Sequence, residues 1–186
     1  MIPLMLLIVV GAGVAGIAIV RTRQTRPSQI MPDDDEVYRE PCDACSLVHV
    51  AIEEAHRREA SRAVQILAGA AVATPIVADA RRLVEVLARL IDHALELARP
   101  GDSISVTATR CNGAVRFAVA DTGPGLLPDQ VAHRFDRYHP AADPRHELHR
   151  CRRIVEAHRG RIGASSILGE GSTLWFTIPL EPELLA

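Results

Sequence analysis

Residues 114–125, with the sequence AVRFAVADTGPG, are the most informative segment of this chain. A strand is expected over residues 114–120, and Asn112-Gly113 before it is a strong signal for a hairpin to another strand over residues 103–109. A tight turn after the strand would account for Gly123-Pro124-Gly125, but it does not account for the carboxylate of Asp121 at the strand end. Asp121 is therefore a candidate binding residue.

The flanking segments alternate helices and strands. A long helix is expected over residues 80–98, with Asp79 as its N-cap and Pro100-Gly101 as its end. Its polar face is predicted to carry Glu85, Arg89, His93 and Glu96. A first helix to about residue 59 and short strands within residues 63–77 precede it. After the glycine turn we expect a helix over residues 128–138, a loop over 139–145, a helix to 158, and strands over 161–166 and 173–179.

Composition limits the function classes. The 186 residues suffice for one domain and an appendage, and 48% hydrophobic with 24% charged residues indicates a chain that folds and is not a polytopic membrane protein. The 21 basic residues nearly balance 23 acidic ones, so nucleic-acid binding is not expected. Every basic residue is Arg, which excludes a phosphate-binding loop of the Walker type because that loop requires Lys.

Four cysteines are too few and too scattered for the disulfide framework of a small secreted domain. Cys42 and Cys45 form a C-x-x-C motif, with His49 one helical turn further on. These are three candidate zinc ligands, but no second pair at the usual spacing completes the set. Incidental or buried thiols are the preferred interpretation, and no metal site is predicted.

Residues 2–20 contain no charged side chain and are nearly long enough to cross a bilayer as a helix. We expect an uncleaved transmembrane anchor, with weak self-association through its glycines. Arg21, Arg23 and Arg26 follow it, so the positive-inside rule places the rest of the chain in the cytoplasm, attached to the inner (plasma) membrane. Residues 21–41 are expected to be a juxtamembrane linker, and residues 42–182 the folded domain.

The same amino-terminal residues permit a second interpretation. Residues 4–10 followed by Gly11, Gly13 and Gly16 also fit a strand that enters a dinucleotide-binding turn, with acidic residues 33–35 at the usual distance. Pro27 and Pro32 interrupt the place of the second strand, and no further β-α-β pattern follows. The membrane anchor is the preferred interpretation.

The order of a long helix, a hairpin, D-x-G-x-G, two helices and G-x-G-S-T before a last strand resembles the ATP-binding domain of sensor histidine kinases, a member of the GHKL ATPase superfamily. The resemblance covers about residues 46–180. It implies an α+β fold of the GHKL (Bergerat) type, a two-layer α/β sandwich with a mixed sheet and helices on one face. Here one transmembrane helix would precede that domain.

The resemblance also implies a nucleotide site. Asp121 matches the aspartate that accepts a hydrogen bond from the adenine amino group, a role that suits an acceptor-only carboxylate. Gly123 and Gly125 match glycines that let the backbone approach the nucleotide. Gly169, Gly171 and Thr173 match the last glycine motif, with Thr173 near the adenine, although this motif alone fits a simple turn equally well.

Departures from the family pattern concern the phosphate end. His93 stands where the family has a magnesium-binding asparagine, and imidazole is a poor magnesium ligand. We expect His93 to lie on a solvent-facing helix face. Arg89 replaces the Glu or Asn of related ATPases, so no general base is evident. Asp92 is the nearest oxygen ligand, but it lies about 100° around the helix from that face.

The second glycine motif of the family aligns with residues 145–150, where Arg145 and Glu147 replace the glycines that let a helix start wrap the phosphates. Arg145 and Arg150 offer guanidinium groups for phosphates, but a solvated charged loop is the preferred interpretation. His146-Glu147-Leu148 is similar to the motif around the family's phosphoacceptor histidine. That motif belongs to a separate helical hairpin for which we expect no room here.

Together these features predict a membrane-anchored, histidine-kinase-like domain that acts as a regulatory module in signal transduction, with a protein partner and no assigned catalytic residue. Weak binding of ATP or ADP with little role for magnesium is expected. Two alternatives stay open: an active kinase that phosphorylates a partner in trans, and a docking domain without nucleotide.

Overall fold

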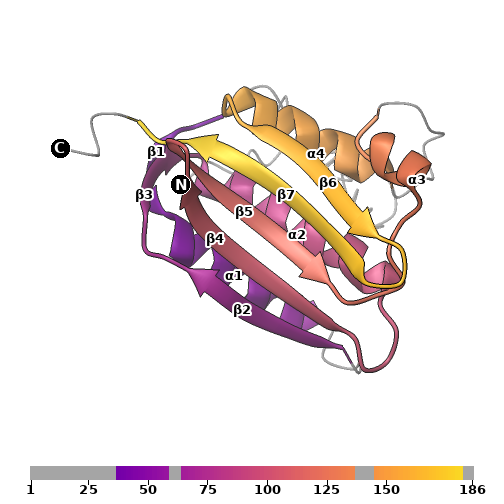
Figure 1. Ribbon diagram of the computed structural model, residues 1–186. Helices are drawn as coiled ribbons and strands as arrows, with labels where there is room; N and C mark the ends of the chain where they lie inside the picture. Colours follow the sequence, from indigo (N-terminus) through magenta and orange to yellow (C-terminus); the bar gives the residue numbers. More distant parts are fainter. Residues whose placement is uncertain (1–36, 59–63, 137–144, 182–186) are drawn as a thin grey trace, which may run out of the picture. The chain divides into compact units, whose positions relative to one another are not determined.

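The computed structural model describes residues 37–58, 64–136 and 145–181, and leaves the side chains of residues 145–147 undescribed. A five-stranded sheet has three helices, α1, α2 and α4, packed on one face (Figure 1). In chain order the elements are β1 (Glu40–Asp43), α1 (Ala44–Arg58), β2 (Gln65–Ala71), β3 (Pro75–Ala78), α2 (Ala80–Leu97), β4 (Ser103–Cys111), β5 (Ala114–Asp121), α3 (Pro128–Ala132), α4 (Arg145–Ala157), β6 (Arg161–Ile167) and β7 (Gly171–Pro179).

The sheet is mixed. Its strand order is β2-β4-β5-β7-β6, in which β2 runs parallel to β4 and the other neighbours are antiparallel. Strands β1 and β3 form a separate antiparallel pair. The α+β fold with a mixed sheet and helices on one face is thus confirmed.

The core lies between the sheet and the helices because strand side chains alternate between two faces. On β5 and β7 the inward positions include Phe117 and Phe176, which pair in register and stack with ring centroids 4.8 Å apart. Helix α2 covers them with an apolar face, from which Leu87 and Leu90 are fully buried. The carboxylate of Asp79 caps this helix by accepting the backbone N–H of Arg82, as predicted.

The hairpin between β4 and β5 is also confirmed. Asn112 and Gly113 both have positive φ, 44° and 73°, as a two-residue hairpin turn of the primed type requires. This turn fixes the register of β5, so Asp121 pairs with Ile104 at the opposite end of the hairpin.

The structure differs from expectation at two element boundaries. Helix α3 ends at Ala132, because Arg134 and Phe135 turn inward and become buried, with exposed fractions of 8% and 7%. Structure is also present before the predicted first helix, within the segment expected to be a linker. Strand β1 includes Glu40, and the backbone N–H of Tyr38 donates to the Asp79 carboxylate over 3.1 Å.

The expected membrane span over residues 2–20 lies outside the described residues. Within residues 37–58, 64–136 and 145–181 no helix is both long and apolar enough to cross a bilayer.

In the same part of the chain, no three His, Cys, Asp or Glu side chains come together as a metal site. Cys42 and Cys45 are half-buried free thiols, and burial raises the pKa of Cys42.

Candidate functional site

Asp121 lies at the carboxyl end of β5, on the sheet face that the helices cover. Its side chain is buried, and Oδ1 accepts the backbone N–H of Gly123 over 2.9 Å. Ser172, directly opposite on β7, donates both its backbone N–H and its hydroxyl to the same carboxylate. Burial raises the pKa of Asp121 and outweighs these hydrogen bonds, which lower it. The result is a preorganised acceptor at the end of the sheet.

Two glycines near Asp121 lie so close to other backbone atoms that a side chain would not fit. A Cβ on Gly171, where φ is +115°, would lie 2.0 Å from the Asp121 carbonyl oxygen. A Cβ on Gly125, where φ is +73°, would lie 2.4 Å from the carbonyl oxygen of Ile167. Both positions therefore need glycine for close backbone approach.

Two hydrogen bonds join the loop after β5 to the turn between β6 and β7. Gly169 donates its N–H to the carbonyl of Pro124 over 2.8 Å, and Leu126 donates to Ser166 Oγ over 2.7 Å. Both predicted glycine motifs therefore belong to one structural unit beside Asp121. A Cβ on Gly169 would meet nothing within 4 Å, so open space adjoins this position.

Ser172, rather than Thr173, lies beside Asp121. Thr173 pairs with Ala120 and Ser165, and strand alternation places its side chain on the face away from the helices. Ser172 was not among the predicted site residues. Its alternation with the buried Leu174 and Phe176 places it on the inward side of β7. The side chains of Thr173 and Asp121 therefore lie on opposite faces of the sheet, which argues against the predicted role of Thr173 at the adenine.

His93 is not on a solvent-facing surface, contrary to expectation. Its side chain is only 10% exposed, because the segment after α3 folds over α2 and brings the guanidinium of Arg134 onto Nε2. Burial, and then the charge of Arg134, lower the pKa of His93 to about 4. The imidazole is therefore neutral at pH 7 and accepts a hydrogen bond from a cation.

His93 belongs to the same region as Asp121. Leu97 follows His93 by one helical turn, and its carbonyl lies 3.6 Å from the position of a Cβ on Gly123. The carboxyl half of α2, the loop after β5 and the start of β7 thus line one side of the site, and Arg134 enters it from the segment after α3.

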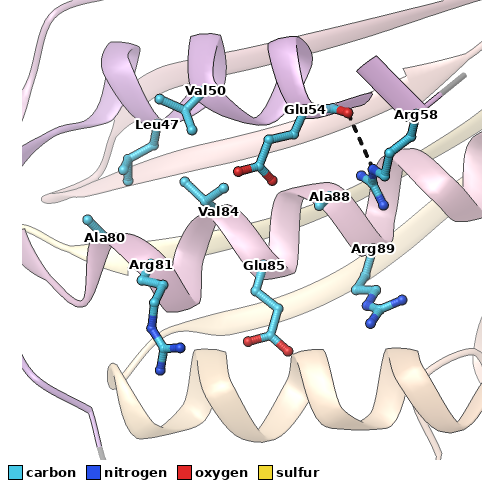
Figure 2. A pocket seen from close by; sticks show the side chains of 10 residues that line it. All are labelled: Leu47, Val50, Glu54, Arg58, Ala80, Arg81, Val84, Glu85, Ala88 and Arg89. Carbon is cyan, nitrogen blue, oxygen red and sulfur yellow. Dashed lines mark hydrogen bonds between the residues drawn. The ribbon is translucent and has the colours of Figure 1, made fainter. Parts of the chain in front are cut away.

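Arg89 and Asp92 lie elsewhere. Asp92 forms an ion pair of 2.8 Å with Arg58 of α1 and is directed to that helix. Arg89 borders an outer groove of about 610 Å³ between α1 and α2, whose apolar floor includes Val50, Val84 and Ala88 (Figure 2). The groove shares no lining residue with the cluster around Asp121, so it is a separate feature of the surface.

Residues 145–150 are the first part of α4, in agreement with the helix expected up to residue 158. They do not form the solvated charged loop that was the preferred interpretation of Arg145 and Arg150. The side chains of Arg145 and Glu147 lie outside the described residues. Arg150 is described: its guanidinium pairs with Glu85 of α2 over 3.1 Å and is 25% exposed. This ion pair gives Arg150 a structural role in holding α4 against α2.

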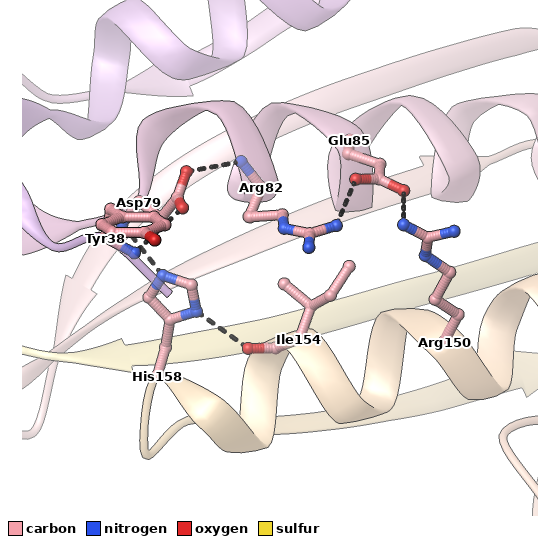
Figure 3. A network of polar contacts seen from close by, with 7 residues as sticks. All are labelled: Tyr38, Asp79, Arg82, Glu85, Arg150, Ile154 and His158. Atoms are coloured by element: carbon pink, nitrogen blue, oxygen red, sulfur yellow. Dashed lines mark hydrogen bonds and ion pairs between the residues drawn. The ribbon is translucent and has the colours of Figure 1, made fainter. Parts of the chain in front are cut away.

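Helices α2 and α4 are joined by a chain of polar contacts that ends at the amino-terminal entry of the domain (Figure 3). Glu85 bridges Arg150 and Arg82, and Arg82 follows the Asp79 cap. His158, after α4, accepts the backbone N–H of Asp79 over 2.9 Å. The two helices that bound the site are thus fixed at their far ends.

Comparison with known proteins agrees with this geometry. The model of the family "Histidine kinase-, DNA gyrase B-, and HSP90-like ATPase" matches residues 78–182, which contain α2, Asp121 and both glycine turns. The chain belongs to this family. The resemblance inferred from the sequence is therefore confirmed.

Individual members of the family show similarity over most of the chain. The adaptive-response sensory kinase SasA of Synechococcus elongatus is 35% identical over 153 residues, covering 78% of this chain and 38% of the kinase. Full-length ShkA in complex with AMPPNP superimposes with a TM-score of 0.70 at 29% identity, covering 78% of this chain and 32% of ShkA. The mycobacterial sensor histidine kinase MprB has the same fold, with a TM-score of 0.67 at 18% identity over 78% of this chain and 99% of the MprB chain.

The chain thus spans little more than a third of the length of the SasA kinase that it matches. What the family members have in common with it is the ATPase domain, which links the chain to signal transduction by sensor kinases. Asp121 fits an adenine chemically, because a carboxylate offers only acceptors to an exocyclic amino group, and open space adjoins Gly169 in the neighbouring turn.

Magnesium does not fit the described residues equally well. The ion requires several hard oxygen ligands in an octahedron. At position 93 the donor is an imidazole whose Nε2 already accepts from Arg134, and the neighbouring group is a cation. At position 93 the described residues therefore offer an imidazole and a guanidinium rather than oxygen ligands for a metal ion.

Proposed function

We propose that this chain is a nucleotide-binding regulatory module of a signalling system, with little or no phosphoryl transfer of its own. The single observation that carries the proposal is the contrast between two ends of one site. The Asp121 acceptor with Ser172 and Gly123 is intact, whereas His93 and Arg134 stand where an oxygen-rich metal site would be needed.

Adenine recognition rests on hydrogen bonding and exclusion of water. The Asp121 carboxylate has about four acceptor positions and accepts hydrogen bonds from the N–H of Gly123 and from the N–H and hydroxyl of Ser172, so one position is left for an exocyclic amino group. ATP or ADP is the expected ligand, and binding is expected to be weak. Without a bound metal, the charge that develops during phosphoryl transfer loses its main stabilisation, and Arg89 stands where related ATPases have a Glu or Asn.

Transfer of labelled phosphate from ATP tests this function. The full chain in detergent, with its candidate partner protein present, is expected to release no labelled phosphate and to label neither protein above a blank. Steady labelling that disappears in Asp121→Asn would instead favour the second candidate, an active kinase acting in trans. The AMPPNP complex of ShkA gives that alternative its support, since a related domain retains an ATP analogue.

We further propose that residues 2–20 anchor the chain in the inner membrane with the domain in the cytoplasm. The uncharged segment followed by three arginines supports this arrangement. Membranes washed at alkaline pH should retain the full chain, and external protease should leave its carboxyl end intact. Recovery in the soluble fraction, or an amino terminus that begins after residue 20, would overturn the proposal.

A further inference from the structure

The contact between His93 and Arg134 defines the protonation state of the imidazole. A guanidinium has only donors, so His93 Nε2 must accept, and the ring proton must sit on Nδ1. Nδ1 lies 3.6 Å from the carboxylate of Glu96, a direction that suits this tautomer. His93 is therefore a neutral positioning group for Arg134.

Arg134 is held in place by its neighbours on both sides. Phe135 is buried in the core, and its carbonyl oxygen lies 3.4 Å from Nδ1 of His149 on α4. Asp136 contacts His133 over 2.7 Å and Arg152 over 3.8 Å. The segment from residue 133 to 136 therefore spans α2 and α4, and it fixes a side chain that keeps its positive charge at any working pH.

The charge lies within reach of a bound nucleotide. Gly123 and Asp121 mark the end of α2 near Leu97, and His93 is one turn, about 5.4 Å, back along the helix. A nucleotide whose base meets Asp121 is longer than one helical turn, so its phosphates reach the His93–Arg134 contact if the nucleotide lies along α2.

We propose that His93 and Arg134 form a tethered cation that replaces a metal ion and makes the site prefer metal-free nucleotide to the magnesium complex. This inference rests on the proposed nucleotide binding. A fixed guanidinium attracts the uncompensated phosphates of free ATP, whereas it repels a divalent ion placed beside it. The chemical class of the preferred ligand is an adenosine di- or triphosphate without bound Mg²⁺.

Calorimetric titration of the full chain in detergent tests the preference, with ATP in excess EDTA, ATP in excess Mg²⁺, and adenosine. The wild type is expected to bind ATP at least about threefold more tightly in EDTA than in Mg²⁺. In Arg134→Gln, affinity in EDTA should fall about tenfold and the preference should vanish, while adenosine affinity stays at the wild-type value. Arg134→Lys should keep the preference because it keeps the charge.

Arg116→Gln is the matched control, because Arg116 stacks over Trp175 on β7 and lies on the sheet face away from the helices. It should leave all three affinities unchanged. Tighter wild-type binding in Mg²⁺ than in EDTA, or a preference that persists in Arg134→Gln, would overturn the inference while leaving nucleotide binding intact. Binding of adenosine without binding of ATP would also overturn the inference about the phosphates, while it would leave the adenine site intact. If the wild type binds neither ligand, the proposed function fails as well.

Discussion

The imidazole of His158 joins the carboxyl end of α4 to the backbone of Asp79, which begins α2. Its Nε2 accepts the Asp79 N–H over 2.9 Å, and its Nδ1 donates to the carbonyl of Ile154 over 2.8 Å. Both ring nitrogens are therefore committed in the neutral tautomer, and a protonated ring cannot accept from Asp79. Burial is the largest cause of the lowered pKa of His158, with Arg39 and Arg82 acting in the same direction and Asp79 against it.

This relationship predicts acid sensitivity. The folded-state pKa values of His158 and His93 lie below 6.5, that of His93 at about 4, so the unfolded chain binds more protons when the pH falls below 6.5. The free energy of unfolding should therefore be highest above pH 6.5 and decline as the pH falls toward about 4. Urea unfolding of the full chain at a series of pH values measures this decline.

Substitution separates His158 from other acid-sensitive groups. His158→Gln should be less stable than the wild type at neutral pH, but its stability should decline less steeply between pH 6.5 and about 4. His56→Gln, at an exposed side chain of α1, should keep the wild-type slope. An unchanged slope in His158→Gln would contradict this account of the Asp79 contact.

Gly171 and Gly169 should respond differently to the same substitution. Gly171→Ala adds a Cβ that would lie 2.0 Å from backbone oxygen, so we expect a loss of about 3 kcal/mol or more in unfolding free energy. Gly169→Ala meets open space and carries only the strain of its positive φ, about 1–2 kcal/mol. Denaturant midpoints of the two variants compare them, and equal losses would show that the close approach at Gly171 is wrong.

Ser172 and Thr173 distinguish the inward from the outward side of β7. Ser172→Ala removes the hydroxyl donor to Asp121 and should weaken ATP or adenosine binding about fivefold, near the contribution of one hydrogen bond. Ser172→Thr should retain binding. Thr173→Ala should have wild-type affinity in the same calorimetric titration, and a loss confined to Thr173→Ala would reverse this assignment.

Local signals in the sequence were sufficient for much of the fold. Asn112-Gly113 specifies a turn with two positive φ values, and Asp79 specifies a helix start, because each effect depends on residues close in the chain. The apolar face of α2 likewise follows from helical spacing. These features carry Asp121 to the end of a central strand, as predicted.

Contacts between distant segments were not predictable in the same way. His93 has the spacing of an exposed helix face, and its burial depends on Arg134, which is 41 positions away in the sequence. This contact also depends on the end of α3 at Ala132. We expected α3 to continue to residue 138, and a helix of that length does not predict that Arg134 turns inward to α2. Ser172 was not predicted because the register between β5 and β7 decides which β7 residue lies opposite Asp121. That register is known only from the assembled sheet.

The central claim is that Asp121 binds the adenine of a nucleotide, and calorimetry with the full chain in detergent and ADP at millimolar concentration tests it most directly. The account predicts weak saturable binding by the wild type that is lost in Asp121→Asn, with Asp129→Asn on exposed α3 as the control that binds like the wild type. Asp121→Asn should remain folded, because it replaces a buried carboxylate with a neutral group of the same shape. Wild-type binding that persists in Asp121→Asn, or no heat of binding for the folded wild type, would contradict the account.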